Sequence, residues 1–204
     1  MAEEQQEEAD IHRPRELYAY HATSSFATDI SMSYFSYFAV RLGASFELLA
    51  WMQSLNNLLP NTLQHFWGWI SDRRVHRAFW IIIGSVLGGF ALWLLSQAQT
   101  PEEVLALLVL YSASLSLVQP TWAALQGDWI PAGRRGRVLS RFHVVGGMAG
   151  LIGSLVALWF VYNSGNETAD GFRPLFVMAA AATALGGLIL VRVPYRDPGD
   201  IPDE

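Results

Sequence analysis

The stretch Ala78–Pro101, AFWIIIGSVLGGFALWLLSQAQTP, contains no Asp, Glu, Lys or Arg. About twenty apolar residues cross the hydrocarbon core of a bilayer as a helix, because lipid offers no partner for an unpaired backbone group. The stretch is long enough to span, and it is apolar nearly all round, whereas a helix of a soluble bundle shows one polar face. It therefore predicts a transmembrane helix.

Five further stretches have a similar length and character, and the first of them is interrupted only by Asp29. Of the 204 residues, 52% are hydrophobic and 15% are charged, whereas a soluble domain carries about a quarter charged residues. The sequence therefore predicts an all-α integral membrane protein with a six-helix transmembrane bundle over 17–193. The expected spans are 18–41, 46–70, 78–97, 103–126, 138–162 and 172–193.

The charges between these spans predict the topology. All 13 basic residues are arginine, and the three connections on one side hold only Arg41 and Arg173. The remaining arginines lie on the other side, which the positive-inside rule makes cytoplasmic. Six spans then place both termini in the cytoplasm, with the acidic segment 1–16 as a disordered tail and 194–204 as a second tail. The expected location is the cell membrane. Most of the tryptophans, Trp122 among them, lie near expected helix ends, where amphipathic rings prefer the headgroup region.

Polar side chains concentrate on four of the six spans. Such groups are costly in a membrane and usually face the bundle interior or a water-filled cavity. The glycine-rich face of span 138–162 fits close helix packing as well as a cavity. The candidate cavity-lining residues are Ser33, Gln53, Asn56, Asn57 and Gln119.

Asp29 is the only acid deep within an expected span. A low dielectric favours the protonated form of a carboxyl group, which suits the binding and release of a proton. We expect Asp29 to bind a coupling proton or a cationic substrate, and the alternative is a structural acid bonded to Ser33 or to a neighbouring helix. His143 carries an imidazole, whose charge changes near neutral pH, and it is a second candidate beside a simple packing role.

Two arginine-rich connections carry more specific patterns. Segment 68–77, GWISDRRVHR, has an acid four residues after a glycine and then spaced arginines, and segment 127–137, GDWIPAGRRGR, has an acid, a proline and then Arg-Gly-Arg. Both resemble the matching cytoplasmic loops of major facilitator superfamily transporters, and the turn 42–45, LGAS, is also typical of that family. The gating residues that the resemblance implies are Gly68, Asp72, Arg73, Arg77, Asp128, Arg135, Gly136 and Arg137.

The resemblance implies the N-terminal six-helix half of a secondary transporter for a small solute, with protons among the open choices of coupling ion. In this family the first and fourth helices of a half line the cavity, the second and fifth meet the other half, and the third and sixth pack outside. Members usually have two halves, and the sequence reaches Glu204 after one. The expected partner is a separately encoded second half or a second copy in a homodimer, and a truncated gene product is left open.

Other functions receive less support. A non-transporting membrane scaffold or sensor is the alternative within the same fold. An intramembrane enzyme is not expected, because the His-Glu-x-x-His metalloprotease pattern is absent and Ser154 has no histidine at its depth. The chain has no cysteine, which excludes thiolate metal sites. We expect no catalytic residues, no metal, no cofactor and no nucleic-acid partner.

Overall fold

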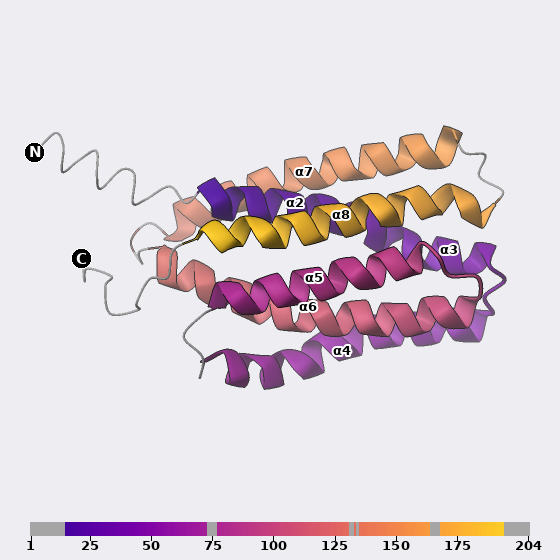
Figure 1. The fold of residues 1–204 in the computed structure, drawn as a ribbon, viewed down its shortest axis with the longest axis horizontal. Coiled ribbons are helices and arrows are strands. Elements are labelled where there is room, and N and C mark those ends of the chain that lie inside the picture. Colours follow the sequence, from indigo (N-terminus) through magenta and orange to yellow (C-terminus); the bar gives the residue numbers. More distant parts are fainter. Residues whose placement is uncertain (1–14, 73–76, 131–132, 134, 164–167, 194–204) are drawn as a thin grey trace, which may run out of the picture.

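The computed structural model describes residues 15–72, 77–130, 133, 135–163 and 168–193, with the backbone alone for residues 68–72. Every regular element in these ranges is a helix, and the long helices run side by side (Figure 1). The elements are α2 (Arg15–Ser31), η1 (Met32–Tyr34), α3 (Phe35–Arg41), α4 (Phe46–Asp72), α5 (Arg77–Leu95), α6 (Pro101–Trp129), α7 (Arg135–Asn163), η3 (Ala169–Phe172), α8 (Arg173–Ile189) and η4 (Leu190–Arg192).

The first expected span is interrupted near its middle. The single 3₁₀ turn η1 separates α2 from α3, and a tighter helix changes the angle between successive side chains. The segment ends at Gly43, whose φ of +94° is open to glycine but strained for other residues. Gly43 N donates to Val40 O at 3.0 Å, and Ala44 N donates to Ala39 O at 2.9 Å. These bonds close the helix end and turn the chain into α4.

The long helices pack in an order that differs from their order in the sequence. α5 lies between α6 and α8, α2 lies between α8 and α7, and α4 packs on α6. The row is therefore α4, α6, α5, α8, α2 and α7, and Figure 1 shows α4 and α7 at opposite edges. α5 and α8, which correspond to the two least polar expected spans, lie in the middle of the row, each between two other long helices.

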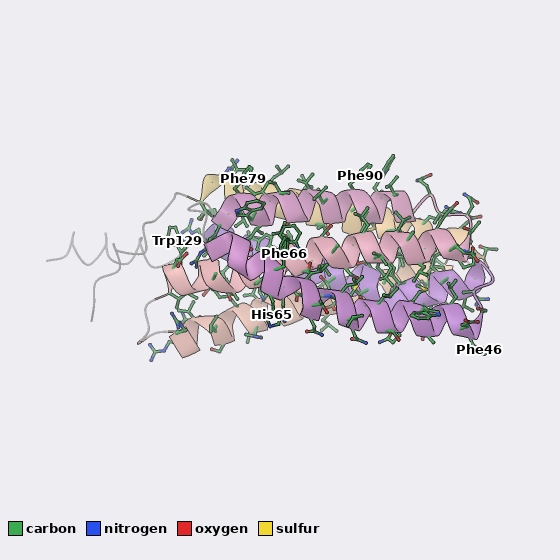
Figure 2. The ribbon with its side chains drawn as sticks, turned by 90° about the horizontal axis from the view of Figure 1, so that it is seen from below. Phe46, His65, Phe66, Phe79, Phe90 and Trp129 are labelled. Atoms are coloured by element: carbon green, nitrogen blue, oxygen red, sulfur yellow. The ribbon has the colours of Figure 1, made fainter. Side chains whose placement is uncertain are left out.

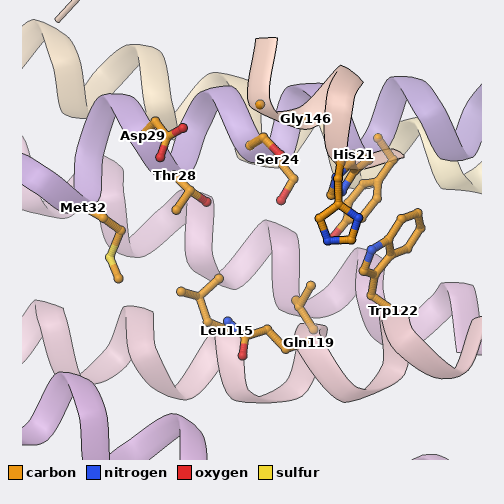
Figure 3. A pocket seen from close by; sticks show the side chains of 14 residues that line it. His21, Ser24, Thr28, Asp29, Met32, Leu115, Gln119, Trp122 and Gly146 are labelled. Atoms are coloured by element: carbon orange, nitrogen blue, oxygen red, sulfur yellow. The ribbon is translucent and has the colours of Figure 1, made fainter. Parts of the chain in front are cut away.

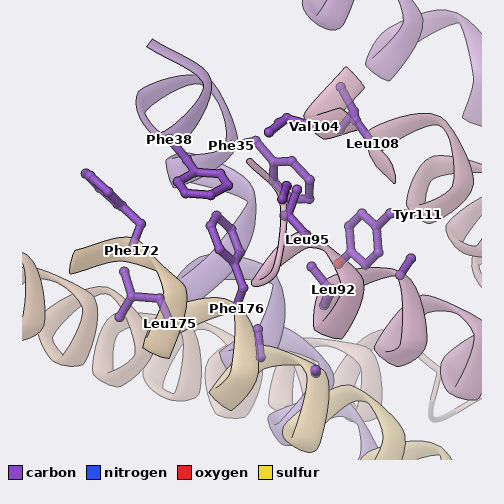
Figure 4. Packing of buried hydrophobic residues seen from close by; sticks show 14 of the residues in the cluster. Phe35, Phe38, Leu92, Leu95, Val104, Leu108, Tyr111, Phe172, Leu175 and Phe176 are labelled. Carbon is purple, nitrogen blue, oxygen red and sulfur yellow. The ribbon is translucent and has the colours of Figure 1, made fainter. Parts of the chain in front are cut away.

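A cluster of aromatic and aliphatic side chains holds one end of the bundle together (Figure 4). Phe38 of α3 lies with its ring centroid 5.2 Å from that of Phe176 of α8, and Phe35 lies 5.7 Å from Tyr111 of α6. At the contact of α5 with α8, a Cβ on Gly89 would lie 2.9 Å from the carbonyl oxygen of Ala180. Small residues let helices approach closely in membrane proteins, and Gly89 serves that purpose here.

Four helices of the described chain are long and apolar enough to cross a membrane: α5, α6, α7 and the combined segment Ala169–Arg192. Figure 2 shows Phe79 and Phe90 projecting from α5 at the edge of the bundle, and both side chains are exposed. α2 and α4 do not meet the same criterion. α2 has 17 residues and is too short by itself, because η1 interrupts the segment, and amide side chains lower the hydropathy of α4.

Candidate functional site

A cavity of about 480 Å³ lies between α2, α6 and α7, and we call it the α2–α6–α7 cavity (Figure 3). Its volume falls in the range of small-molecule sites, roughly 300–1,000 Å³. α6 and α7 meet beside it, where the ring of Trp122 contacts that of Phe142. The lining residues are Tyr20, His21, Ser24, Ser25, Thr28, Asp29, Met32, Leu115, Val118, Gln119, Trp122, His143, Gly146 and Gly147.

The polar part of the lining comes mainly from α2. His21, Ser25 and Asp29 follow each other at intervals of four residues, so that they share one face of the helix. Ser24 and Thr28 widen this face, and all five side chains are partly buried. Among the described residues, Asp29 is the only acid of the lining, and no arginine contributes to it. A full negative charge on Asp29 therefore has no opposite full charge from an arginine beside it in the cavity.

Glycines of α7 allow α2 to lie directly against its backbone. A Cβ on Gly146 would lie 2.5 Å from His21 Nε2, and a Cβ on Gly150 would overlap the carboxyl group of Asp29. A Cβ on Gly153 would lie 2.8 Å from the carbonyl oxygen of Phe26. The glycine-rich face thus packs closely on α2, and the same close approach fixes where His21 and Asp29 lie.

Aromatic rings form the other end of the cavity. The ring of His21 stacks on the indole of Trp122 with centroids 5.9 Å apart and planes at 11°. Tyr20 lies 4.7 Å from Trp122, and Phe142 meets the indole edge-on at 5.9 Å. His143 also lines this region, and its Nδ1 lies 2.8 Å from the carbonyl oxygen of Leu139. When Nδ1 carries the proton and donates there, Nε2 is left as an acceptor.

The amide-rich helix α4 stands outside this cavity. Ser112 Oγ of α6 donates to Asn56 Oδ1 at 3.3 Å, which joins the two helices. Asn57 instead donates through Nδ2 to the carbonyl oxygen of Gln53 in its own helix, at 2.9 Å, and both side chains are exposed. Ser33 lies in η1 and is exposed as well. Of the five residues expected to line a cavity, Gln119 alone belongs to the α2–α6–α7 lining.

An ion pair joins the beginning of α5 to the end of α6. Arg77 Nη1 lies 2.9 Å from Asp128 Oδ1, with 24% and 18% of the two side chains exposed. The partial burial excludes part of the water that weakens surface pairs. The pair connects the two arginine-rich loops that were singled out in the sequence.

A comparison of the sequence with protein families matches residues 17–204 to the Major Facilitator Superfamily. The chain belongs to this superfamily. Comparison with curated proteins found no match. As a member of the major facilitator superfamily, the chain is a multi-pass membrane protein of a family of transporters rather than enzymes. The resemblance seen in its two arginine-rich loops is thereby confirmed.

The structure describes only some of the other loop residues expected from the superfamily pattern. Arg135, Gly136 and Arg137 form the first turn of α7, and all three are exposed. Gly68 and Asp72 lie in the last turns of α4, where the backbone alone is described, and Arg73 lies outside the described residues. Between the described residues of these two loops, the ion pair of Arg77 with Asp128 is the contact that could change during gating.

The sequence did not single out His21 or Trp122. His21 lies eight residues before Asp29 and four before Ser25, so helical spacing alone places it on the same face. Trp122 was assigned to the headgroup region because it lies near a helix end, but its ring contacts His21, Tyr20 and Phe142. Only the packing of α2 on α6 and α7 reveals that contact.

Proposed function

We propose that this chain forms the solute-binding half of a secondary transporter and that Asp29 in the α2–α6–α7 cavity binds the solute or a coupling proton. The observation that carries the proposal is a carboxyl group that lines a cavity of about 480 Å³ together with hydroxyl, amide and imidazole groups. Ionisable residues at membrane depth mark solute and proton pathways. Gln119 and His143 line the same cavity and are the next candidates for contact with the solute or proton.

The same proposal includes six membrane crossings. α4 has 27 residues, which at 1.5 Å per residue gives about 40 Å, enough to span a hydrocarbon core of about 30 Å. α2, η1 and α3 together run from Arg15 to Arg41, a similar length. Their polar groups are tolerated because they face a cavity or a partner rather than lipid. The proposed bundle is thus residues 17–193, and the segments before and after it are both cytosolic tails.

The arginines orient this bundle. The chain turns at the same end of the bundle between α4 and α5 and between α6 and α7, and η4 contacts both α2 and α5. The arginines at this end of the described chain are Arg15, Arg77, Arg135, Arg137, Arg141 and Arg192. Arg41 and Arg173 lie at the opposite end. By the positive-inside rule the arginine-rich end is cytoplasmic, and the cell membrane is the proposed location.

A single-cysteine scan tests the crossings, because the natural chain has no cysteine. Ser45→Cys, between α3 and α4, should react with an impermeant thiol reagent from outside the cell. Gly133→Cys, between α6 and α7, should react only after the membrane is opened. Labelling of both positions from the same side would contradict the proposed topology.

A second six-helix body should cover the polar and apolar faces at the edges of the row. On α4, the exposed Gln53, Asn57 and Asn61 follow each other at intervals of four residues, and Trp51 and Leu58 are exposed as well. Exposed amides are unfavourable against lipid tails and favourable against another polar helix. The second body is a second copy of the chain or a separate half. Native mass spectrometry of nanodiscs distinguishes a homodimer from a monomer that needs another chain.

Arg77 and Asp128 are the proposed cytoplasmic latch. Their pair holds the beginning of α5 against the end of α6, and the exposed Arg137 at the beginning of α7 carries a further charge that a moving partner half would meet. A charge-assisted hydrogen bond of this kind favours the conformation in which it forms. The latch would thus bias the equilibrium between the conformations that open to either side.

Flux in proteoliposomes tests the central proposal. Vesicles containing the complete assembly and an internal pH dye are exposed in turn to sugars, amino acids, amines and carboxylates. We expect at least one class to give flux that Asp29→Asn abolishes, while Ser33→Ala, which changes an exposed residue outside the cavity, leaves it intact. Normal flux and unchanged pH dependence in Asp29→Asn would remove Asp29 from the mechanism. Absence of flux with every class would favour the scaffold or sensor.

A further inference from the structure

The charges of the α2–α6–α7 cavity select against anions. Within the part of the chain that the structure describes, Asp29 is its one acid and no arginine lines it, and the chain contains no lysine. His21 and His143 are the other titratable groups of the lining besides Tyr20. At about pH 8 free imidazole and phenol are both neutral. An anion entering the cavity would find no fixed positive charge among these groups, whereas a cation would find a carboxyl group that can act as its counter-charge.

The two ends of the cavity differ in chemistry. Asp29 and His21 are eight residues apart in α2, which corresponds to about 12 Å along the helix axis at 1.5 Å per residue. Around Asp29 the lining is Thr28 and Met32, and around His21 it is the indole of Trp122 (Figure 3). Leu115 of α6 lies between these groups in Figure 3, and Val118 of α6 also belongs to the lining. A ligand that uses both ends must carry a charged group separated from an apolar ring.

We propose that the cavity binds organic cations that carry an aromatic ring, with the ammonium group at Asp29 and the ring against Trp122 and His21. The inference rests on the proposed function of this cavity as the solute site and names the class of solute. A carboxylate gives a charge-assisted hydrogen bond to an ammonium group. An aromatic wall favours a planar apolar group through burial and edge or offset stacking.

Three probes of the same skeleton and different charge test the proposal: 4-phenylbutylamine, 4-phenylbutanol and 4-phenylbutanoate. Binding to the protein in nanodiscs is measured by equilibrium dialysis at about pH 8, and empty nanodiscs correct for partition into lipid. We expect saturable binding of the amine, at least tenfold weaker binding of the alcohol, and no saturable binding of the carboxylate. This comparison uses the natural chain, so it does not depend on the folding of a variant.

Two variants then test which end of the cavity binds the ammonium group and which binds the ring. Asp29→Asn should abolish the preference for the amine over the alcohol, because it removes the charge and keeps the shape. Trp122→Ala should weaken both probes about equally and preserve their ratio. Ser33→Ala, an exposed residue outside the cavity, is the matched control and should bind as the natural chain does. Thermal unfolding of each variant in nanodiscs confirms that it is folded.

Several results would overturn the inference. They are absence of saturable amine binding up to millimolar concentration, binding of the carboxylate as tight as that of the amine, and a tenfold preference for the amine that persists in Asp29→Asn. The flux assay distinguishes failure of this inference from failure of the proposed function. Flux that depends on Asp29 without amine binding removes the solute class alone. Amine binding that depends on Asp29, without flux of any solute, keeps the site and removes transport.

Discussion

Replacing Gly153 of α7 with alanine tests whether α2 and α7 pack backbone to backbone. The added Cβ would lie 2.8 Å from the carbonyl oxygen of Phe26 and 3.3 Å from its ring atom Cδ2. The carbonyl belongs to the backbone of α2, so it cannot rotate away as a side chain does. Since ordinary contacts begin at 3.4 Å, the two helices must separate by about 0.6 Å.

The expected cost follows from two opposing effects. Overpacking of this kind costs about 1–3 kcal/mol, and the better helix propensity of alanine offsets up to about 1 kcal/mol. Gly147 provides the control, because a Cβ there meets nothing within 4 Å, so that Gly147→Ala gains propensity without crowding. Gly153→Ala should therefore be less stable than Gly147→Ala by about 1–3 kcal/mol, which is the crowding term alone.

Unfolding in mixed micelles with increasing SDS, followed by circular dichroism, measures the difference between the two variants. We expect Gly153→Ala to unfold at a lower SDS fraction than Gly147→Ala. If the two alanine variants unfold together, α2 and α7 are not in close contact. That result would also contradict the conclusion that the glycines of α7 determine where His21 and Asp29 lie.

Two further predictions concern the ends of the bundle. Arg77→Ala should lower the free energy of unfolding by about 1–2 kcal/mol, because it removes the bond to Asp128. In a double-mutant cycle, Arg77→Ala should have little further effect on this free energy once Asp128→Asn is present. Additive losses in the two variants would exclude the ion pair. Arg173 donates to the carbonyl oxygen of Ser96 at 2.6 Å and to Asp170 at 2.8 Å. Arg173→Ala should increase hydrogen exchange at the end of α5, and Arg137→Ala, an exposed arginine at the other end, should not; equal exchange in both variants would remove the structural role of Arg173.

The helices themselves were predictable from the sequence because long uncharged stretches leave few alternatives. The described helices begin and end close to the expected ranges. The interruption of the first span was not predicted. Ser33 lies in the three-residue 3₁₀ helix and is exposed, although uniform α-helical spacing would place it on the same face as Asp29. No proline or glycine within α2, η1 and α3 marks the change.

The site was predicted in part, and its composition depended on packing. Asp29 stood out because an acid inside a span is rare. Asn56 and Asn57 are neighbours, and successive residues of an α-helix point about 100° apart. Only Asn56 reaches α6, and the sequence of α4 cannot show which of the two does so. The contact of His21 with Trp122 depends on how three helices meet, which hydropathy does not encode.

Water access to the α2–α6–α7 cavity tests the account most directly. The chain has no cysteine, so Gln119→Cys places one thiol in the cavity and Leu155→Cys places one on the apolar face of α7. Both natural side chains are exposed. A charged, impermeant thiol reagent should modify Gln119→Cys at least tenfold faster in open membranes, because thiolates form in water and not in lipid. Equal rates at the two positions would mean that Asp29 lines no solute pathway.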